Sequence, residues 1–216
     1  MPPRVLVFTR TTGYRHDSIP DAVAALDGGE LPRVTVSEDP ADVAACGRYD
    51  VVAFVSTTGD VLDARGRDAL RSFVEGGGGF TGVHSAAATE SSWDWYADLL
   101  GARFAGHPEG VQKATVRVDD GHPSTAHLPS SWVFADEWYA FSDVRPGSTL
   151  LLDVDESTYR PAGYAMPDPH PQAWCRSVGA GRSWYTALGH SAAAWSDGRF
   201  RTHVANGIRW AAGALT

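Results

Sequence analysis

The stretch GGGGFTGVHSAAA, residues 76–88, contains the strongest indication of the fold. Its first glycines are typical of a helix end and a tight turn, and the run from Gly79 to His84 is typical of a buried strand. The segment Gly82–Ala86 has the small–x–residue–x–small form of a nucleophile elbow, in which a strand turns sharply into a helix. Because only small neighbours leave room for that bend, the pattern predicts a strained backbone and an exposed side chain at His84.

The elbow belongs to an alternation of strands and helices in the first part of the chain. Helical spacing of apolar residues predicts helices that begin after Ser18 and after Asp63, both plausible N-caps. Short apolar runs predict four strands, at residues 4–9, 33–37, 49–56 and 79–84. This order predicts an α/β fold with a mostly parallel sheet that has helices on both faces.

The middle of the chain, residues 110–174, contains seven of the 13 prolines and several short runs of strand composition. This composition predicts β-rich segments added at one edge of the sheet. The alternation resumes with a strand expected over 181–190 and a closing helix over about 200–212. Since the sequence shows neither a repeat nor a low-complexity linker, we expect residues 1–216 to form a single domain.

The composition and the net charge limit the classes of partner that this protein is expected to bind. The net charge is −8, without a run of Lys or Arg, so neither nucleic acid nor an anionic membrane surface is an expected partner. No signal peptide is visible, and no stretch approaches the roughly 20 apolar residues that cross a bilayer, which predicts a cytoplasmic protein. The two cysteines, Cys46 and Cys175, lie in unrelated contexts and are expected to be reduced thiols.

Three histidines, His16, His84 and His190, each follow a predicted strand. The carboxyl ends of parallel strands lie at one edge of a sheet, where open α/β sheets bind ligands, so we expect these imidazoles to gather at one site. Each of them alone is more often a turn residue or a helix cap.

Several motifs in a fixed order carry a resemblance to a known family. They are GYRHDSI, GGGGFTGVHSA, GHPEG, DDGHPSTAHLP, DEWYAF, HPQAWCRSVGAGRSWYTALGH and GIRWAAG, and they span essentially the whole chain. On these motifs the chain resembles the trehalose-utilisation, ThuA-like family. The resemblance implies a flavodoxin-like three-layer sandwich related to class I glutamine amidotransferases. It also implies a role in the use of trehalose or similar disaccharides, without a defined reaction.

In the related amidotransferases the elbow residue is a cysteine nucleophile, and a histidine follows a later strand. In this chain the elbow residue is His84, and His190 of the LGH motif matches the later histidine. An imidazole cannot form the thioester that glutaminase chemistry requires, so we do not expect glutaminase activity.

One functional hypothesis is an enzyme that acts on trehalose or a related keto-disaccharide as an isomerase, lyase or hydrolase. Its expected catalytic residues are His84, His190 and Glu137. Histidine exchanges protons near neutral pH and therefore suits the removal of a proton beside a sugar carbonyl. Asp136 and Glu137 are neighbours on a predicted strand and should point to opposite faces, which disfavours the paired carboxylates of an ordinary glycosidase.

Residues near these motifs are expected to bind the substrate: Tyr14, Arg15, His16, Thr58, Ser85, Trp138 and Tyr139. A divalent metal such as zinc is a variant of the enzyme hypothesis, and a polar pocket without a metal competes with it. The candidate metal ligands are His16, His84, His107, Glu137 and His190. Because none of these residues has short ligand spacing, the metal hypothesis depends wholly on the fold.

The second hypothesis is a non-catalytic carbohydrate-binding or regulatory protein. Tryptophan rings stack on sugars, and among the eight tryptophans Trp93, Trp95 and Trp195 are expected near the rim of a site. In both hypotheses the partner is a small sugar, and a homo-oligomer is compatible with the sequence.

Overall fold

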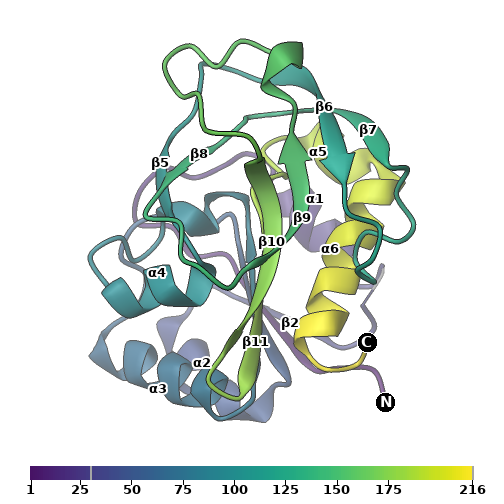
Figure 1. The fold of residues 1–216 in the computed structure, drawn as a ribbon. Coiled ribbons are helices and arrows are strands. Elements are labelled where there is room, and N and C mark those ends of the chain that lie inside the picture. Colours follow the sequence, from purple (N-terminus) through teal and green to yellow (C-terminus); the bar gives the residue numbers. More distant parts are fainter. Residues whose placement is uncertain (30, 216) are drawn as a thin grey trace.

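A mixed sheet of nine strands runs through the centre of the computed structural model, which describes residues 1–29 and 31–215 (Figure 1). Within the described residues the strand order is β2-β1-β3-β4-β11-β10-β9-β6-β7, and β5 and β8 form a separate pair. The strands are β1 (Val5–Phe8), β2 (Val34–Ser37), β3 (Val51–Val55), β4 (Gly79–Val83), β5 (Arg103–Gly106), β6 (Gln112–Val118), β7 (Ser131–Asp136), β8 (Ala140–Ser142), β9 (Thr149–Val154), β10 (His170–Val178) and β11 (Gly181–Thr186). The helices are α1 (Ile19–Leu26), α2 (Pro40–Ala44), α3 (Ala64–Glu75), α4 (Asp94–Leu100), α5 (Ala192–Ser196) and α6 (Gly198–Ala211), with short 3-10 turns η1 (Cys46–Arg48), η2 (His84–Ala88) and η3 (Glu156–Thr158).

One half of the sheet is parallel. β1 pairs with β2 and β3, and β4 pairs with β3 and β11, all in the same direction. Every residue of β1, β3 and β4 is buried, which explains their nearly continuous apolar composition. The predicted parallel α/β arrangement is confirmed. The strand expected over 181–190 is shorter than predicted, because β11 ends at Thr186 and the following residues form a loop.

The other half of the sheet is antiparallel. β10, β9, β6 and β7 continue the same sheet beyond β11, each running opposite to its neighbour. They come mainly from the proline-rich middle of the chain, where the sequence predicts β-rich segments at one edge. These segments are a larger addition than expected, since they make up nearly half of the strands in the sheet.

Helices cover both faces of the sheet and bury two apolar clusters (Figure 1). On one face, Leu26 of α1 and Ile208 of α6 belong to the first cluster. On the other face, Leu70 of α3 and Leu99 of α4 belong to the second. The fold therefore has three layers, and the carboxyl ends of the parallel strands all lie at one edge of the middle layer.

The two predicted N-caps differ in outcome. The Asp63 side chain accepts a hydrogen bond from the Gly66 backbone N–H at 2.7 Å and caps α3 as predicted. Ser18 precedes α1 but makes no capping bond, because its own backbone is already helical (φ −77°, ψ −5°). Its hydroxyl donates to the Gly189 carbonyl oxygen at 3.4 Å, so Ser18 connects α1 to the loop after β11.

Cys46 and Cys175 are both free thiols, as the sequence predicts, and the structure shows that both are buried. Among the residues that the structure describes, no helix is both long enough and apolar enough to cross a membrane.

The closing helix α6 buries one side in the core, and this side consists of Phe200, Val204, Ile208 and Ala211. The same helix buries His203 completely. His203 Nδ1–H donates to the Ser124 carbonyl oxygen at 2.9 Å, and His203 Nε2 is buried without a hydrogen-bond partner. Burial lowers the pKa of His203 to about 3, so the ring is neutral in the folded protein.

His203 should therefore make the fold sensitive to acid. Between its usual pKa of 6.5 and its folded pKa of about 3, the unfolded chain binds more protons than the folded chain, so stability falls as the pH falls. We expect this residue to remove roughly 2 kcal/mol of the free energy of unfolding between pH 7.5 and pH 5. Urea denaturation at both values would measure it.

His203→Asn keeps a donor near the Nδ1 position but cannot be protonated, so it should lose that part of the pH dependence. His127→Asn is the matched control, because His127 is exposed. Equal acid sensitivity in wild type and His203→Asn would contradict the prediction.

A candidate active site at the carboxyl ends of the parallel strands

The elbow at His84 has the predicted backbone. β4 ends at Val83, and His84 starts η2 with a positive φ of 53°. A Cβ atom at Gly82 would lie 3.0 Å from Leu100 Cδ1 and 3.0 Å from Tyr185 Cδ2, so a small residue is required there. The predicted exposure of the His84 side chain is wrong, because the ring is 0% exposed. The Tyr139 ring, centred 4.7 Å from it, packs against it.

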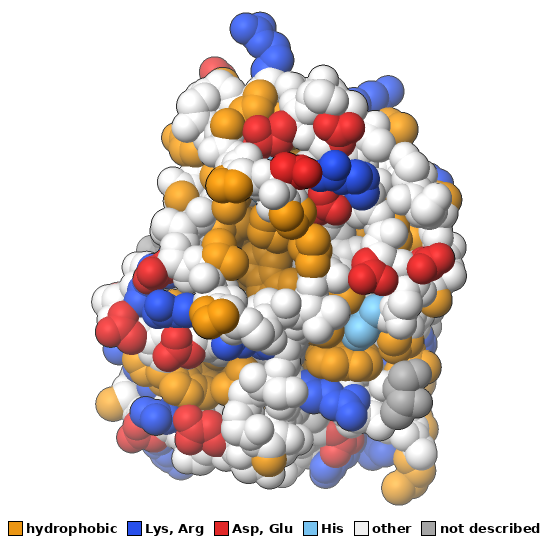
Figure 2. All heavy atoms as spheres, in the orientation of Figure 1, with side chains coloured by type: hydrophobic (Ala, Val, Ile, Leu, Met, Phe, Trp, Pro, Cys, Tyr) orange, Lys and Arg blue, Asp and Glu red, His pale blue; other side chains and the backbone are white. Residues whose placement is uncertain are grey.

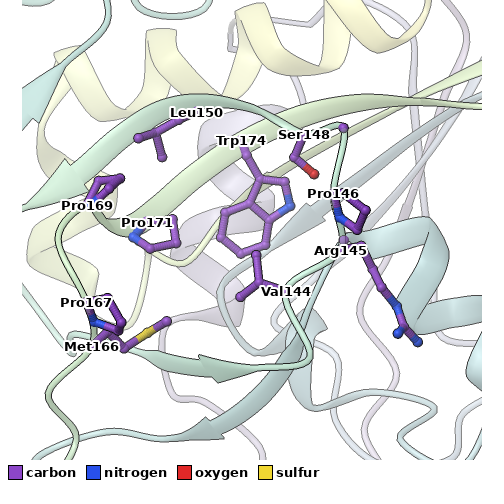
Figure 3. A pocket seen from close by; sticks show the side chains of 12 residues that line it. Val144, Arg145, Pro146, Ser148, Leu150, Met166, Pro167, Pro169, Pro171 and Trp174 are labelled. Atoms are coloured by element: carbon purple, nitrogen blue, oxygen red, sulfur yellow. The ribbon is translucent and has the colours of Figure 1, made fainter.

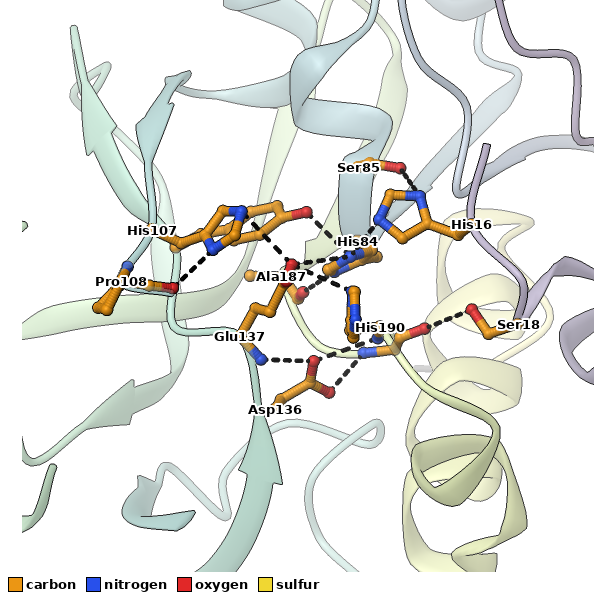
Figure 4. Close-up of polar contacts among 12 residues, drawn as sticks. His16, Ser18, His84, Ser85, His107, Pro108, Asp136, Glu137, Ala187 and His190 are labelled. Atoms are coloured by element: carbon orange, nitrogen blue, oxygen red, sulfur yellow. Dashed lines mark hydrogen bonds and ion pairs between the residues drawn. The ribbon is translucent and has the colours of Figure 1, made fainter. Parts of the chain in front are cut away.

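Hydrogen bonds fix the tautomer of His84. Its Nδ1 lies 2.7 Å from the Ala187 carbonyl oxygen, which can only accept, so Nδ1 carries the proton. In the neutral ring Nε2 is then an acceptor. It lies 2.9 Å from the Tyr139 hydroxyl and 3.1 Å from His16 Nε2 (Figure 4).

His16 comes from the loop after β1 and is also buried. Its Nδ1 lies 3.3 Å from the Ser85 hydroxyl, which leaves Nε2 facing His84. The His16 and His190 ring centres are 5.3 Å apart. The three strand-end imidazoles that the sequence predicts to converge are therefore in one cluster (Figure 4).

Glu137 extends into the middle of this cluster from the end of β7. Its Oε2 lies 3.1 Å from His190 Nδ1, 3.7 Å from His84 Nε2 and 3.6 Å from His107 Nε2 (Figure 4). The approach to His190 is an ion pair without hydrogen-bond geometry, so His190 Nδ1 is buried without a hydrogen-bond partner. Asp136 points elsewhere and accepts only backbone N–H groups, so the two carboxylates do not form a pair.

Burial and neighbouring charges set the protonation of the cluster. Burial, followed by the effect of His190, lowers the pKa of His16 to about 4. Burial and then His16 hold the pKa of His84 well below its usual value. Glu137 raises the pKa of His190 against the effect of burial. Burial would raise the pKa of Glu137, but His190, His107 and His16 together lower it. At neutral pH His16 and His84 are therefore neutral imidazoles, and they lie beside the contact between Glu137 and His190.

This arrangement fits a divalent metal ion. One ligand atom from each of His16, His84, Glu137 and His190 lies within 4.8 Å of all the others. Imidazole nitrogens and a carboxylate are donors that zinc and similar ions accept. The facing Nε2 atoms of His16 and His84 need a cation or a proton between them. His107, the fifth predicted ligand, lies outside this set, and its Nδ1–H donates to the Pro108 carbonyl oxygen at 2.8 Å.

Some residues expected to bind substrate border the cluster. Ser85 and Tyr139 contact the imidazoles directly, as described above. Tyr14 is 67% exposed, and its ring lies 4.8 Å from the His16 ring at the mouth of the site. Thr58 does not reach the cluster, because its hydroxyl donates to the Tyr14 carbonyl oxygen at 2.6 Å and holds that loop.

Two other residues that are expected to bind substrate, Arg15 and Trp138, do not border the cluster. Arg15 turns away from the cluster to an ion pair with Glu38 at 2.7 Å. Trp138 is buried on the other side of the sheet from Tyr139, and its Nε1–H donates to the Gln112 carbonyl oxygen at 3.0 Å. The two side chains part because successive residues of an extended chain point to opposite faces.

The tryptophans expected at the rim have structural contacts. Trp195 is buried, and its Nε1–H donates to the Gly189 carbonyl oxygen at 3.0 Å, so its predicted rim position is wrong. The Trp93 and Trp95 rings lie 4.9 Å apart, and Trp95 donates to Glu75. These two rings pack against the cluster that contains α3 and α4.

Two side chains that could not be recognised from the sequence hold the backbone of Tyr139 in place. His170 Nε2 and Gln172 Nε2 both donate to the Tyr139 carbonyl oxygen, at 2.8 and 2.9 Å. Both residues lie on β10, inside the HPQAW motif. Neither periodicity nor spacing connects that motif to the elbow, so only the fold brings them together.

An apolar cavity of about 370 Å³ lies in front of β9 and β10 and shares no lining residue with the imidazole cluster (Figures 2 and 3). Trp174 forms its floor, with Leu150, Met166 and several prolines around it (Figure 3). Its lining contains no histidine or carboxylate. The chemistry of the described residues therefore points to the cluster and not to this cavity.

Comparisons with known proteins agree with the fold. The family model described as "ThuA: Trehalose utilisation" matches residues 4–211. A comparison with curated protein sequences finds no significant match.

Solved structures with the same fold include two described as ThuA-like. The one from Bacteroides uniformis is 22% identical with a TM-score of 0.79, over 96% of this chain and 90% of that chain. The one from Parabacteroides merdae is 19% identical with a TM-score of 0.80, over 100% and 92%. A protein from Thermoplasma acidophilum described as a component of GMP synthase is 11% identical with a TM-score of 0.56, over 97% and 95%.

The close packing at Gly82 predicts the effect of a single methyl group. Gly82→Ala should lower the free energy of unfolding by about 1–3 kcal/mol, because the new Cβ overpacks against Leu100 and Tyr185. Gly47→Ala is the control, since nothing lies within 4 Å of a Cβ there, and it should change stability by less than about 0.5 kcal/mol. Equal effects of the two substitutions in urea denaturation would show that the elbow is not tightly packed.

Proposed function

The chain belongs to the ThuA family, described as trehalose utilisation, and on that premise we propose that it is an enzyme acting on a disaccharide such as trehalose or its keto derivative. We place the reaction at the cluster of His16, His84, Glu137 and His190. One observation carries the proposal: these four ligand atoms lie within 4.8 Å of one another at the carboxyl ends of parallel strands. Buried groups with displaced pKa values beside a carboxylate are typical of functional sites.

We propose that a divalent metal ion, zinc by the types of ligand, is bound by these four residues. The neutral state of His16 and His84 supports this, because a metal requires unprotonated imidazoles. The hydrogen bond from His84 Nδ1 to the Ala187 carbonyl oxygen supports it too, since metal-binding histidines are oriented in this way by their other nitrogen. When bound, the ion would polarise a sugar carbonyl oxygen or a water molecule.

With His84, His190 and Glu137 as metal ligands, we assign proton transfer to His107. Its Nδ1–H is held by the Pro108 carbonyl oxygen, so in the neutral ring Nε2 has a free lone pair. The side chain is 30% exposed and stacks on Tyr139 at the edge of the cluster, so substrate can reach it. His107 would remove the proton next to a keto-sugar carbonyl, which is the step that starts an isomerisation or an elimination.

We also propose that the parallel half is of the flavodoxin type. Its order β2-β1-β3-β4-β11 corresponds to the strand order 2-1-3-4-5 of that fold. This supports the relation to glutamine amidotransferases at the level of the fold, while His84 at the elbow excludes their thioester chemistry. The single-domain organisation, the cytoplasmic location and a homo-oligomer stay predictions from the sequence.

Metal binding is the first test. The chain, stripped with a chelator and then titrated with zinc in competition with a coloured chelator, should bind one ion. His16→Ala and His190→Ala should each weaken binding by at least about tenfold, since each removes a ligand. His127→Ala is the control, because His127 is exposed and lies outside the cluster. Zinc binding that is unchanged in both cluster variants would rule out this site.

Turnover is the second test. Metal-loaded protein should convert 3-keto-trehalose, and His107→Gln should lower kcat by about 10²- to 10⁴-fold while it keeps the metal. Product formation followed by chromatography would measure this, with His127→Ala again as the control. Saturable sugar binding without turnover would instead favour the non-catalytic carbohydrate-binding function.

A further inference from the structure

Asp136 is a carboxylate with no exposed surface at the end of β7, next to the cluster but not part of it. Its two oxygens accept three hydrogen bonds, all from backbone N–H groups (Figure 4). Two of the donors, Gly189 and His190, are in the loop after β11, and the third is the next residue, Glu137. Burial raises the pKa of Asp136 to about 7, although the three N–H groups lower it. A buried charge is tolerated only when it is satisfied in this way.

One oxygen of Asp136 binds the backbones of both residues of the ion pair. Asp136 Oδ1 accepts from the Glu137 N–H at 2.9 Å and from the His190 N–H at 3.1 Å. The side chains of those two residues meet at 3.1 Å on the cluster side. The backbones that carry the pair are therefore held by the same atom.

The other oxygen holds the loop one residue earlier. Asp136 Oδ2 accepts from the Gly189 N–H at 2.8 Å. The Gly189 carbonyl oxygen is bound from the opposite side by Trp195 Nε1–H and by the Ser18 hydroxyl. Gly189 has φ 120°, and a Cβ there would meet Phe200 at 3.2 Å and Val83 at 3.3 Å. The peptide before His190 is thus held on both sides.

We propose that Asp136 is the positioning residue of this site, which sets the separation and orientation of Glu137 and His190 by binding both of their backbone N–H groups. The predicted effect of Asp136 on metal affinity rests on the metal site proposed above. The proposal assigns to Asp136 a task that neither Glu137 nor His190 can perform alone, because Glu137 lies just after β7 and His190 lies in the loop after β11.

A carboxylate is required because all of its partners are donors. In Asp136→Asn the amide has one oxygen and one NH₂ group, so in either orientation at least one backbone N–H faces another donor. The substitution hardly changes the volume, so it tests the hydrogen bonds and not the packing.

The experiment compares Asp136→Asn with wild type in two readouts at the same pH. Zinc affinity, measured by chelator competition, should fall by about 10- to 100-fold, the range seen when residues that orient metal ligands are changed. With cobalt in place of zinc, the visible spectrum of the bound ion should change, because the ligands are no longer held at the same angles.

Glu90→Gln is the matched control. Glu90 is also 0% exposed, and its Oε1 accepts from the backbone N–H groups of Val61 and Leu62, but it does not contact the cluster. Its loss should destabilise the fold while zinc affinity and the cobalt spectrum stay as in wild type. Equal losses of zinc affinity in the two variants would show that Asp136 contributes only to the stability of the fold, and this result would overturn the proposal.

A measurement without metal keeps the inference separate from the proposed function. In wild type, the Gly189 and His190 amides should exchange with solvent deuterium only on global unfolding, as slowly as the amides of β4. In Asp136→Asn their exchange should accelerate selectively. If zinc does not bind but this pattern holds, the metal proposal fails and Asp136 remains the positioning residue of the ion pair. Rapid exchange of both amides in wild type would sink the inference, and this test stands even if the variant does not fold.

Discussion

The hydrogen bond from His84 Nδ1 to the Ala187 carbonyl oxygen links two strand ends that are 103 residues apart in the chain. It fixes the tautomer of a ring that is fully buried, and it turns the other nitrogen toward His16, Tyr139 and Glu137. This bond exists only because β4 and β11 are parallel neighbours, so that both leave the sheet at the same edge. The positive φ at His84 is a strained conformation for a residue other than glycine. The contacts that surround the buried ring hold the residue in that conformation.

Electrostatics in the cluster follow from its burial. Burial lowers the pKa of His16 and of His84, which keeps both imidazoles neutral at pH 7, whereas Glu137 raises the pKa of His190. The pKa of the same chemical group is therefore shifted in opposite directions within a few ångströms. Opposite shifts of this kind are how one site gives chemically similar groups different roles in proton transfer.

The sequence predicted those parts of the site that depend on local patterns. The apolar runs predicted where the parallel strands lie. The position of His16, His84 and His190 directly after predicted strands indicated that these three side chains lie close together. The burial of His84 could not be predicted, because Tyr139 covers it from a segment with neither helical nor alternating periodicity. The rim position expected for Trp195 failed for a related reason: an indole N–H next to a loop can bind a carbonyl oxygen as readily as it can face a sugar.

The parallel and antiparallel halves of the sheet meet where β11 pairs with β10, and the site needs residues from both halves. The parallel half supplies the three strand-end imidazoles, while Glu137 and Tyr139 lie in the segment that follows β7, the last strand of the antiparallel half. Neither half contains a complete set, so the constellation comes into being only when distant stretches of the polypeptide have docked. A metal ion bound there would link the two halves of the sheet. Because only the folded chain has the complete site, metal binding would stabilise the folded state over any partly folded one.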